Sequence, residues 1–272
     1  SSAASDVYKR QCQKNKTFKN PKEQLQLTET PTKPFDIVEI DTIGPFNKSY
    51  DNNEYAVTMI CNMTKYMVTV PIPDKRAKTI AKAIFENFIL IYGPMKQILT
   101  DQGTEYKNQI LTELTKLLNI KHNIATSYHH QTLGTCERSH RTFNEYVRAY
   151  INEGKTDWDV YLKYFTYCYN TTPSTTHGYC PYELIFAKKT PNLSFLEKTE
   201  VDPIYNLDLY STEAKYLLQL ANKRTHEILK RQKRERKAIY DEKSSPQNFK
   251  IGDLVLLDNQ PRHKLDLSLI HI

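Results

Sequence analysis

The order of strand-like and helix-like segments restricts the fold of this chain more than any other feature of its sequence. Three β-rich runs come first, and the second and third are close enough in sequence to form a hairpin. The β-rich runs are residues 35–46, 55–64, 66–73, 96–101 and 123–128, and helical patterns cover 77–92, 109–118, 135–152, 158–169 and 211–240. A hairpin followed by helical crossovers predicts an α/β fold, a mixed five-stranded sheet flanked by helices.

Charge and cysteine content narrow the class of protein only slightly. The 272 residues carry 38 Lys and Arg against 31 Asp and Glu, and the net charge of +7 weakly favours a polyanionic partner. The five cysteines are odd in number and widely spaced, which indicates a reducing compartment and no disulfide framework. The longest apolar run, around residues 84–92, contains Glu86 and Asn87, so we expect no membrane span.

Three acidic residues lie where predicted strands and helices begin or end. Asp41 lies in the first β-rich run, Asp101 ends the run 96–101, and Glu137 is in the first turn of the helix 135–152. Strand ends meet at one edge of an open sheet, where three carboxylates repel each other unless cations neutralise them. Oxygen ligands favour Mg²⁺ or Mn²⁺, and two such ions suit in-line phosphoryl transfer. Taken singly, each acid is explained more simply as a helix cap, a turn residue or a salt-bridge partner.

The sequence around the three acids favours the shared site. Between Asp101 and Glu137 lie 35 residues. With this spacing, four blocks in order resemble the catalytic core of retroviral and gypsy-type LTR-retrotransposon integrases, the D,D-35-E family. The blocks are VEIDTIGPF (38–46), LTDQGTEYKN (99–108), SYHHQTLGTCERSHRTFNEYVRAYI (127–151) and NTTPSTTHGYCPYELIFAKK (170–189). One departure is His130, where many relatives carry Pro.

This resemblance implies an RNase H-like fold and a metal-dependent DNA integrase. Asp41, Asp101 and Glu137 match the family's catalytic residues, which hold two Mg²⁺ or Mn²⁺ ions. Gly103 matches a turn where a side chain would crowd the site, and Gly134 falls at the flexible loop before the catalytic helix. In the implied reaction, water cuts near the 3′ end of the element DNA, and the freed 3′-hydroxyl then attacks target DNA.

The same resemblance implies the partners and the place of action. The partners are double-stranded DNA, as element ends and as target, and further copies of the chain in a homo-oligomer. No membrane is involved. The chain is expected to act on chromosomal DNA in the nucleus and to occur in a cytoplasmic virus-like particle.

Two other functions remain open. A cut-and-paste transposase or an RNase H-type nuclease has the same fold, but the Arg-Ser-His-Arg-Thr continuation after Glu137 argues against both. A domesticated integrase core acting as a DNA- or protein-binding module, without catalysis, is the second alternative. The intact triad weighs against it, because a binding module does not need three clustered carboxylates.

The helix 135–152 carries one candidate surface for DNA. Its polar face combines Glu137 with Arg141, Asn144 and Arg148. The opposite stripe is predicted to be buried and consists of Phe143, Val147, Tyr150 and Ile151. Solvation and a Glu–Arg pair are the simpler explanation of the polar face, but the family carries DNA-contacting side chains at the matching positions. Arg138 and His140 are weaker candidates on the same helix.

A second candidate surface is the highly charged helix near the C-terminal end. Residues 223–237 hold eight Lys or Arg and two Glu, which is also typical of a solvated helix. In the family this region links the core to a small barrel, so sequence-tolerant contacts with phosphates are expected. The candidate residues are Lys230, Arg231, Lys233 and Arg234.

The resemblance also divides the chain into segments. Residues 1–11 are expected to be a non-native tail, and 12–34 the remnant of an N-terminal zinc module with its linker. The catalytic core is expected over 35–200, and a connector with a basic linker helix over 201–248. Residues 249–272 resemble the first strands of an SH3-like β module, truncated and with a non-native end.

Two cysteines carry separate expectations. Cys12 matches the last ligand of the family's zinc site, whose partner histidines and second cysteine are absent from this sequence. A single ligand cannot hold Zn²⁺, so we expect no zinc in the chain. Cys136 lies beside Glu137 and is a candidate for a reactive thiol.

Overall fold

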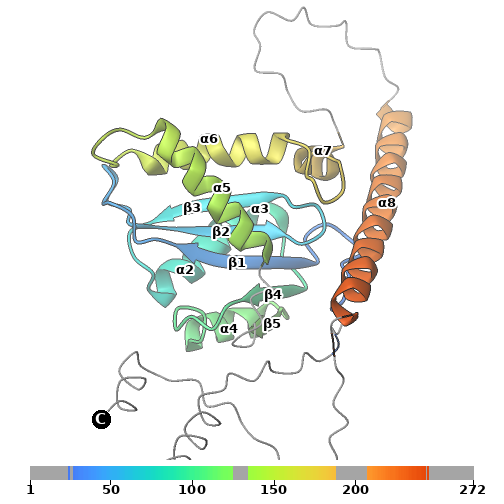
Figure 1. Cartoon of the computed structure of the whole chain (residues 1–272), viewed down its shortest axis with the longest axis horizontal. Coiled ribbons are helices and arrows are strands. Elements are labelled where there is room, and N and C mark those ends of the chain that lie inside the picture. The colour runs from blue at the N-terminus through green and yellow to red at the C-terminus, as the bar shows by residue number, and fades with distance from the viewer. Residues whose placement is uncertain (1–23, 25–26, 125–133, 188–206, 243, 245–272) are drawn as a thin grey trace, which may run out of the picture. The chain divides into compact units, whose positions relative to one another are not determined.

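Five strands form one mixed sheet in the computed structural model of the chain (Figure 1). They lie in the order β3-β2-β1-β4-β5, with antiparallel pairing from β3 to β1 and parallel pairing from β1 to β5. The strands are β1 (Ile37–Ile43), β2 (Tyr55–Cys61), β3 (Met67–Ile72), β4 (Gln97–Thr100) and β5 (Lys121–Ile124). The predicted α/β fold with a mixed five-stranded sheet is therefore confirmed.

The structure describes residues 24, 27–124, 134–187, 207–242 and 244. The chain forms two compact units, Thr28–Arg234 and a second made of Ser1–Leu27 and Glu235–Ile272. The described part of the second unit is mainly the end of one helix, with an ion pair of 2.6 Å between Lys237 Nζ and Asp241 Oδ2. The expected tail 1–11, Cys12, His130 and the expected β module 249–272 lie outside the described residues.

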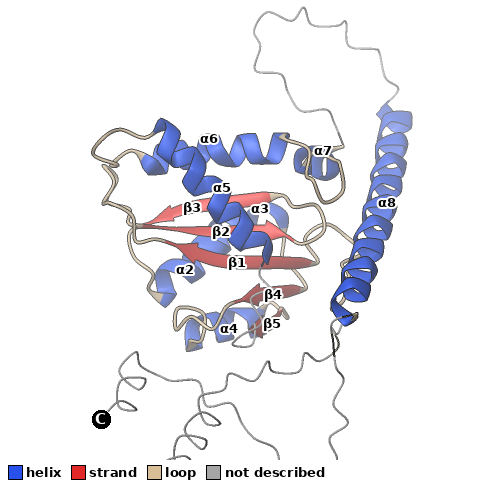
Figure 2. Cartoon of the chain, viewed as in Figure 1, coloured by secondary structure: helices blue, strands red, loops and turns tan. Residues whose placement is uncertain are grey.

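Helices cover both faces of the sheet (Figure 2). One face carries α2 (Ala77–Ile84), a π-helical segment (Phe85–Ile89), α3 (Leu90–Tyr92) and α4 (Gln109–Leu117). The other face carries α5 (Gly134–Tyr150) and α6 (Trp158–Thr171). The helix predicted over 77–92 is thus present, with a wider π turn in its middle. None of the described helices is both long and apolar enough to cross a membrane.

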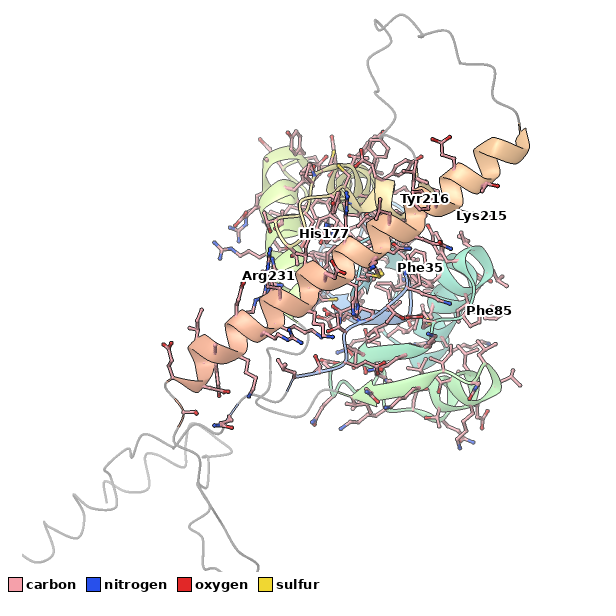
Figure 3. The ribbon with its side chains drawn as sticks, turned by 90° about the vertical axis from the view of Figure 1, so that its right-hand side faces the viewer. Phe35, Phe85, His177, Lys215, Tyr216 and Arg231 are labelled. Atoms are coloured by element: carbon pink, nitrogen blue, oxygen red, sulfur yellow. The ribbon has the colours of Figure 1, made fainter. Side chains whose placement is uncertain are left out.

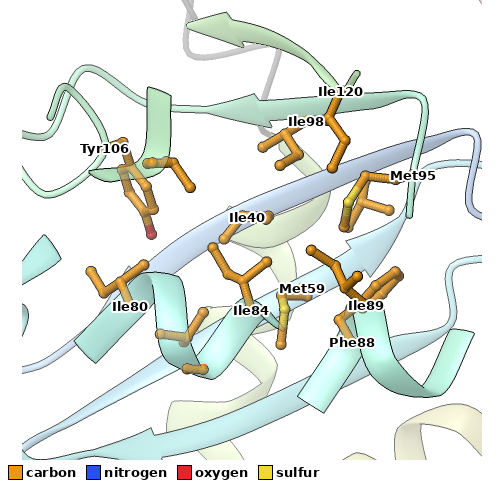
Figure 4. Close-up of a cluster of buried hydrophobic side chains, with 14 of the residues drawn as sticks. Ile40, Met59, Ile80, Ile84, Phe88, Ile89, Met95, Ile98, Tyr106 and Ile120 are labelled. Atoms are coloured by element: carbon orange, nitrogen blue, oxygen red, sulfur yellow. The ribbon is translucent and has the colours of Figure 1, made fainter. Parts of the chain in front are cut away.

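The core between the sheet and α2 is apolar (Figure 4). Val38 and Ile40 of β1 point to this face because side chains alternate along a strand. They pack with Ile84 and Phe88, and all four side chains are fully buried. The helical pattern of residues 77–92 predicts one apolar face formed by Ile80, Ile84, Phe88 and Ile91. The first three are buried, as predicted, but Ile91 lies after the π turn and is 63% exposed.

The core on the α5 and α6 side combines aromatic and aliphatic side chains. Phe143 and Val147 of α5 are buried against Trp158 and Phe165 of α6, as the predicted stripe requires. Tyr150 contradicts that prediction, because it is 58% exposed. Its ring lies at the surface with the ring of Tyr146, at a centroid distance of 4.6 Å, instead of in the core.

Two helices follow the sheet and its covering layers. α7 (Pro181–Phe186) was not among the predicted helices, although Pro181 at the first helical position favours a helix start. The charged helix, α8 (Leu207–Asp241), is longer than predicted. Within the first unit α8 contacts the core: Leu229 packs with Cys61 and Met63.

Candidate catalytic site

Asp41 lies in the second half of β1, on the side of the sheet that faces α5. Its side chain is largely buried, and the backbone N–H of Thr42 donates a hydrogen bond of 2.8 Å to its Oδ1. Burial raises the pKa of Asp41 to about 6, against the effect of the Thr42 hydrogen bond. The negative charges of Asp101, Glu105 and Glu39 raise this pKa further. Among the described residues, the charges that shift the pKa of Asp41 are therefore all negative.

Asp101 follows the end of β4, the parallel neighbour of β1, so both acids lie toward the same edge of the sheet. The backbone N–H of Gly103 donates a hydrogen bond of 2.9 Å to Asp101 Oδ1. A Cβ atom at Gly103 would lie 3.0 Å from Asp101 Oδ1 and 2.6 Å from Glu105 Oε2. A side chain at this turn would press closely on Asp101 and would require the flexible end of Glu105 to move, which agrees with the crowding expected at this position.

Tyr106 joins the Asp101 turn to β1, a role that the sequence reasoning missed. Its side chain is buried, and its hydroxyl shares a hydrogen bond of 2.6 Å with Thr42 Oγ1, next to Asp41 (Figure 4). Burial raises the pKa of Tyr106 well above its usual range, and the nearby carboxylates add to this effect. An aromatic residue five positions after Asp101, in an otherwise polar turn, was the available signal.

Glu137, the third predicted acid, lies in the first turn of α5. Its side chain is outside the described part of the structure, so the position of its carboxylate relative to Asp41 stays a prediction. No group of three His, Cys, Asp or Glu side chains among the described residues is arranged to hold a metal ion. The described half of the site is the pair Asp41 and Asp101.

His140 lies one turn after Glu137 and points into the site. Its Nδ1 is 3.6 Å from Asp41 Oδ2, and its buried Nε2 has no hydrogen-bond partner among the described residues. Burial lowers the pKa of His140 to about 4. Burial raises the pKa of Asp41 and lowers the pKa of His140, so it favours the uncharged form of each group. The imidazole is therefore neutral at physiological pH, and its contact with Asp41 is not an ion pair. The side chain thus faces Asp41, whereas the sequence suggested a DNA contact.

The remaining candidates on α5 form an exposed polar surface. Arg138, Arg141, Asn144 and Arg148 are all exposed, and Arg141 Nε lies 3.2 Å from Glu145 Oε1. Asn144 and Arg148 also line a cavity of about 550 Å³ whose other walls include Phe46, Lys155 and Trp158. Their contact with DNA stays a prediction, and their exposure is compatible with it.

The four candidates on α8 divide into two kinds. Lys230, Arg231 and Arg234 are exposed, and Arg231 is labelled in Figure 3. Lys233 is half-buried, and its ammonium donates hydrogen bonds of 3.1 and 2.8 Å to the carbonyl oxygens of Thr28 and Glu29. Lys233 therefore ties α8 to the segment that precedes β1, and this geometry does not favour its expected role in DNA contact.

Cys136 is not the reactive thiol that its position beside Glu137 suggested. Its side chain is fully buried. Burial raises the pKa of the thiol well above its usual range, and the charges of Glu39 and Asp41 raise it further. Because the thiolate is the reactive form, a thiol in this environment is inert.

Comparisons with known proteins identify the type of domain. Residues 31–130 match the family described as "Integrase core domain". The chain is 54% identical over 246 residues to the Retrovirus-related Pol polyprotein from transposon 412 of Drosophila melanogaster, covering 90% of this chain and 20% of that polyprotein. It is 30% identical over 178 residues to the Gypsy retrotransposon integrase-like protein 1 of Homo sapiens, covering 65% of this chain and 33% of that protein. The chain thus spans a minor part of the length of both relatives.

A solved structure extends the likeness to the fold. The structure of a simian T-cell lymphotropic virus intasome in complex with PP2A regulatory subunit B56 gamma has a TM-score of 0.53 and 16% identity, covering 72% of this chain and 68% of that chain. At this identity the likeness concerns the fold alone. The sheet and its helices define an RNase H-like core. The sequence matches show that the chain carries an integrase core domain of the retrotransposon and retroviral type.

Proposed function

We propose that this chain is the catalytic core of a DNA integrase, which processes the 3′ ends of element DNA and joins them to target DNA. The observation that carries the proposal is the pair of carboxylates, Asp41 and Asp101, at one sheet edge beside Gly103. The first turn of α5, with Glu137, follows on the same face of the sheet as Asp41. This set of acids is what two-metal phosphoryl transfer requires.

The residues present fit Mg²⁺ or Mn²⁺. Carboxylate oxygens are the ligands these ions prefer, and the charged neighbours that shift the pKa of Asp41 are the carboxylates of Asp101, Glu105 and Glu39, all of which raise it. Asp41, Asp101 and Glu137 would hold two ions, with Gly103 leaving room beside Asp101. When bound, the ions supply the Lewis acidity that stabilises charge on the attacking and leaving oxygens. Neutral His140 leaves the negative charge of the site undiminished for this purpose.

DNA would be held by the exposed polar face of α5, whose arginines suit phosphate oxygens. Arg141, Asn144 and Arg148 continue along this face from the turn that carries Glu137. On α8, Lys230, Arg231 and Arg234 offer further contacts. Concerted joining requires two element ends at one target, so we infer a homo-oligomer, acting on chromosomal DNA in the nucleus.

A DNA-joining assay with the 272-residue chain tests this function. The substrate is a branched DNA that resembles the strand-transfer product, in Mg²⁺ or Mn²⁺, and the measured reaction is its reversal to separate duplexes. Glu137→Gln should reduce the rate at least about 10³-fold. The matched control is Glu145→Gln, an exposed acid two turns later on α5, which should retain the wild-type rate within about twofold.

The outcome also separates this function from a binding module. If wild type and Glu137→Gln bind the branched DNA equally and neither converts it, the enzymatic proposal is wrong and a DNA-binding role takes its place. If both variants convert the DNA at the same rate, the triad is not the catalytic group. In the same assay, replacing the divalent cation with EDTA should abolish the reaction.

A further inference from the structure

Glu39 is a buried carboxylate that the proposed chemistry does not use. It lies in β1, two residues before Asp41, and is 2% exposed. A buried carboxylate costs several kcal/mol unless charge pairing and hydrogen bonds compensate for it. Glu39 lies on the same face of β1 as Asp41 and is directed toward α5, so α5 is where groups that stabilise its buried charge are expected.

The hydrogen bond of Glu39 is to the beginning of α5. Its Oε2 accepts a hydrogen bond of 3.3 Å from the backbone N–H of Cys136, the residue immediately before Glu137. Backbone N–H groups in the first turn of a helix have no acceptor within the helix, and the positive end of the helix dipole favours a carboxylate there. Glu39 therefore acts as a helix cap supplied by the neighbouring strand.

Lys65 supplies the opposite charge. It lies in the turn between β2 and β3, is 6% exposed, and donates a hydrogen bond of 3.2 Å from Nζ to Asn62 Oδ1. Burial lowers the pKa of Lys65, and the negative charge of Glu39 acts against that shift. The α5 amide and the Lys65 ammonium thus both stabilise the charge on Glu39.

The spacing of two strand residues matches one turn of the helix. Glu39 contacts Cys136, and Asp41 lies 3.6 Å from His140, so positions two apart on β1 meet positions four apart on α5. Two strand residues span about 6.6 Å and four helical residues about 6 Å. We propose that Glu39 is a positioning residue, which holds the first turn of α5 on β1 and thereby sets where Glu137 meets Asp41 and Asp101.

This inference rests on the proposed function for its catalytic consequence, and the test separates the two. In the double variant Glu39→Leu/Lys65→Met both buried charges are removed together, so that neither is left unpaired. The matched control is Asp159→Asn, another buried carboxylate (4% exposed) that accepts hydrogen bonds from Ser49 and Asn53. Both variants alter a buried acid, but only the first removes a described hydrogen bond to α5.

Hydrogen exchange of the α5 amides tests the positioning without any need for activity. The Cys136 amide and its first-turn neighbours should exchange at least about tenfold faster in Glu39→Leu/Lys65→Met than in wild type and Asp159→Asn. Equal exchange in all three proteins would overturn the inference. This readout holds even if the chain has no joining activity, so failure of the proposed function would be recognised separately by the Glu137→Gln comparison.

Metal affinity and kinetics test the consequence for Glu137. Mn²⁺ titrated by calorimetry should bind about tenfold more weakly to Glu39→Leu/Lys65→Met, approaching the affinity of Glu137→Gln. The kcat for the branched DNA should fall 10- to 100-fold, with KM and the DNA Kd in EDTA unchanged. Wild-type Mn²⁺ affinity and kcat in a variant that merely melts at lower temperature would show a structural role only and would overturn the proposal.

Discussion

The two faces of the sheet bury different chemistry. The side covered by α2 and α4 is filled by apolar residues such as Ile84 and Phe88. The side covered by α5 buries Glu39 and most of Asp41 within a few residues of each other on one strand. Burying charged groups lowers stability. The α2 side therefore serves mainly as the scaffold, and the α5 side is less stable because it contains the acidic residues of the reactive site.

Asp41→Asn should have the largest and most opposed effects, since it should lower the activity strongly and raise the stability. The rate of DNA joining should fall at least about 10³-fold, because a ligand of the proposed metal site is lost. In EDTA at pH 8, the free energy of unfolding should rise by about 1 kcal/mol. The sign follows from the raised pKa of Asp41, about 6: above that pH the folded protein carries an ionised group that its surroundings disfavour.

The assays for this variant are the branched-DNA reaction and urea unfolding monitored by circular dichroism. A lower free energy of unfolding would mean that the Asp41 carboxylate is stabilised by its neighbours. That result would contradict the view that the charge of Asp41 is disfavoured by its surroundings.

Phe88→Ala should have the converse effect on the apolar face. Phe88 is fully buried and its ring lies 5.3 Å from that of Phe35, so truncation leaves a cavity and should cost about 3–5 kcal/mol of unfolding free energy. Joining activity per folded molecule should be unchanged. Leu117→Ala, at a side chain of α4 that is 83% exposed, is the control and should cost less than about 0.5 kcal/mol. Loss of activity in folded Phe88→Ala would show that the scaffold face also shapes the site.

His177, on the α5 and α6 side of the sheet, should make the free energy of unfolding depend on pH. Its Nδ1 accepts a hydrogen bond from the Tyr179 N–H, and its Nε2 donates to the Thr64 carbonyl at 3.2 Å. Burial, the largest cause, lowers its pKa to about 4. Between pH 6.5 and 4 the unfolded chain binds a proton that the folded protein does not, so unfolding free energy falls by up to about 3 kcal/mol over this window.

The measurement is urea unfolding of wild type and His177→Asn at several pH values. The difference between the two proteins should shrink as the pH falls from 7 to 4, because the contribution of His177 is complete only above pH 6.5. A constant difference over this range would mean that the imidazole is accessible to protons in the folded protein.

The contrast between the faces also explains what the sequence could predict. The apolar face follows from periodicity, which local sequence carries, so Ile84 and Phe88 were identifiable in advance. Asp41 and Asp101 were recognisable as acids at strand ends. The burial of Glu39 could not be predicted in this way, because an acidic residue in a strand with several polar residues is usually exposed. Glu39 is buried because α5, which lies much later in the sequence, packs over this face of β1. The orientation of His140 likewise depends on the rotation of α5 against β1, which no local pattern encodes.

The smallest predicted effect concerns the binding of DNA, which we expect on the α5 face and not on the α2 face. Arg148→Ala removes an exposed guanidinium from α5 and should weaken DNA binding about three- to tenfold. The slope of log Kd against log salt concentration should decrease in magnitude by about 1, because one fewer counterion is released per lost phosphate contact. Fluorescence anisotropy with a labelled duplex at four salt concentrations measures both quantities.

Arg76→Ala is the matched control for this charge. Arg76 precedes α2 on the apolar side of the sheet, is exposed, and among the described residues forms an ion pair with Asp74 at 3.7 Å. Its removal changes the net charge of the protein by the same amount, but it should leave the salt slope unaltered. If both variants weaken binding equally, the effect is one of overall charge, and the assignment of DNA to the α5 face is wrong. A loss confined to Arg148→Ala would instead place the DNA on the face that carries the acids.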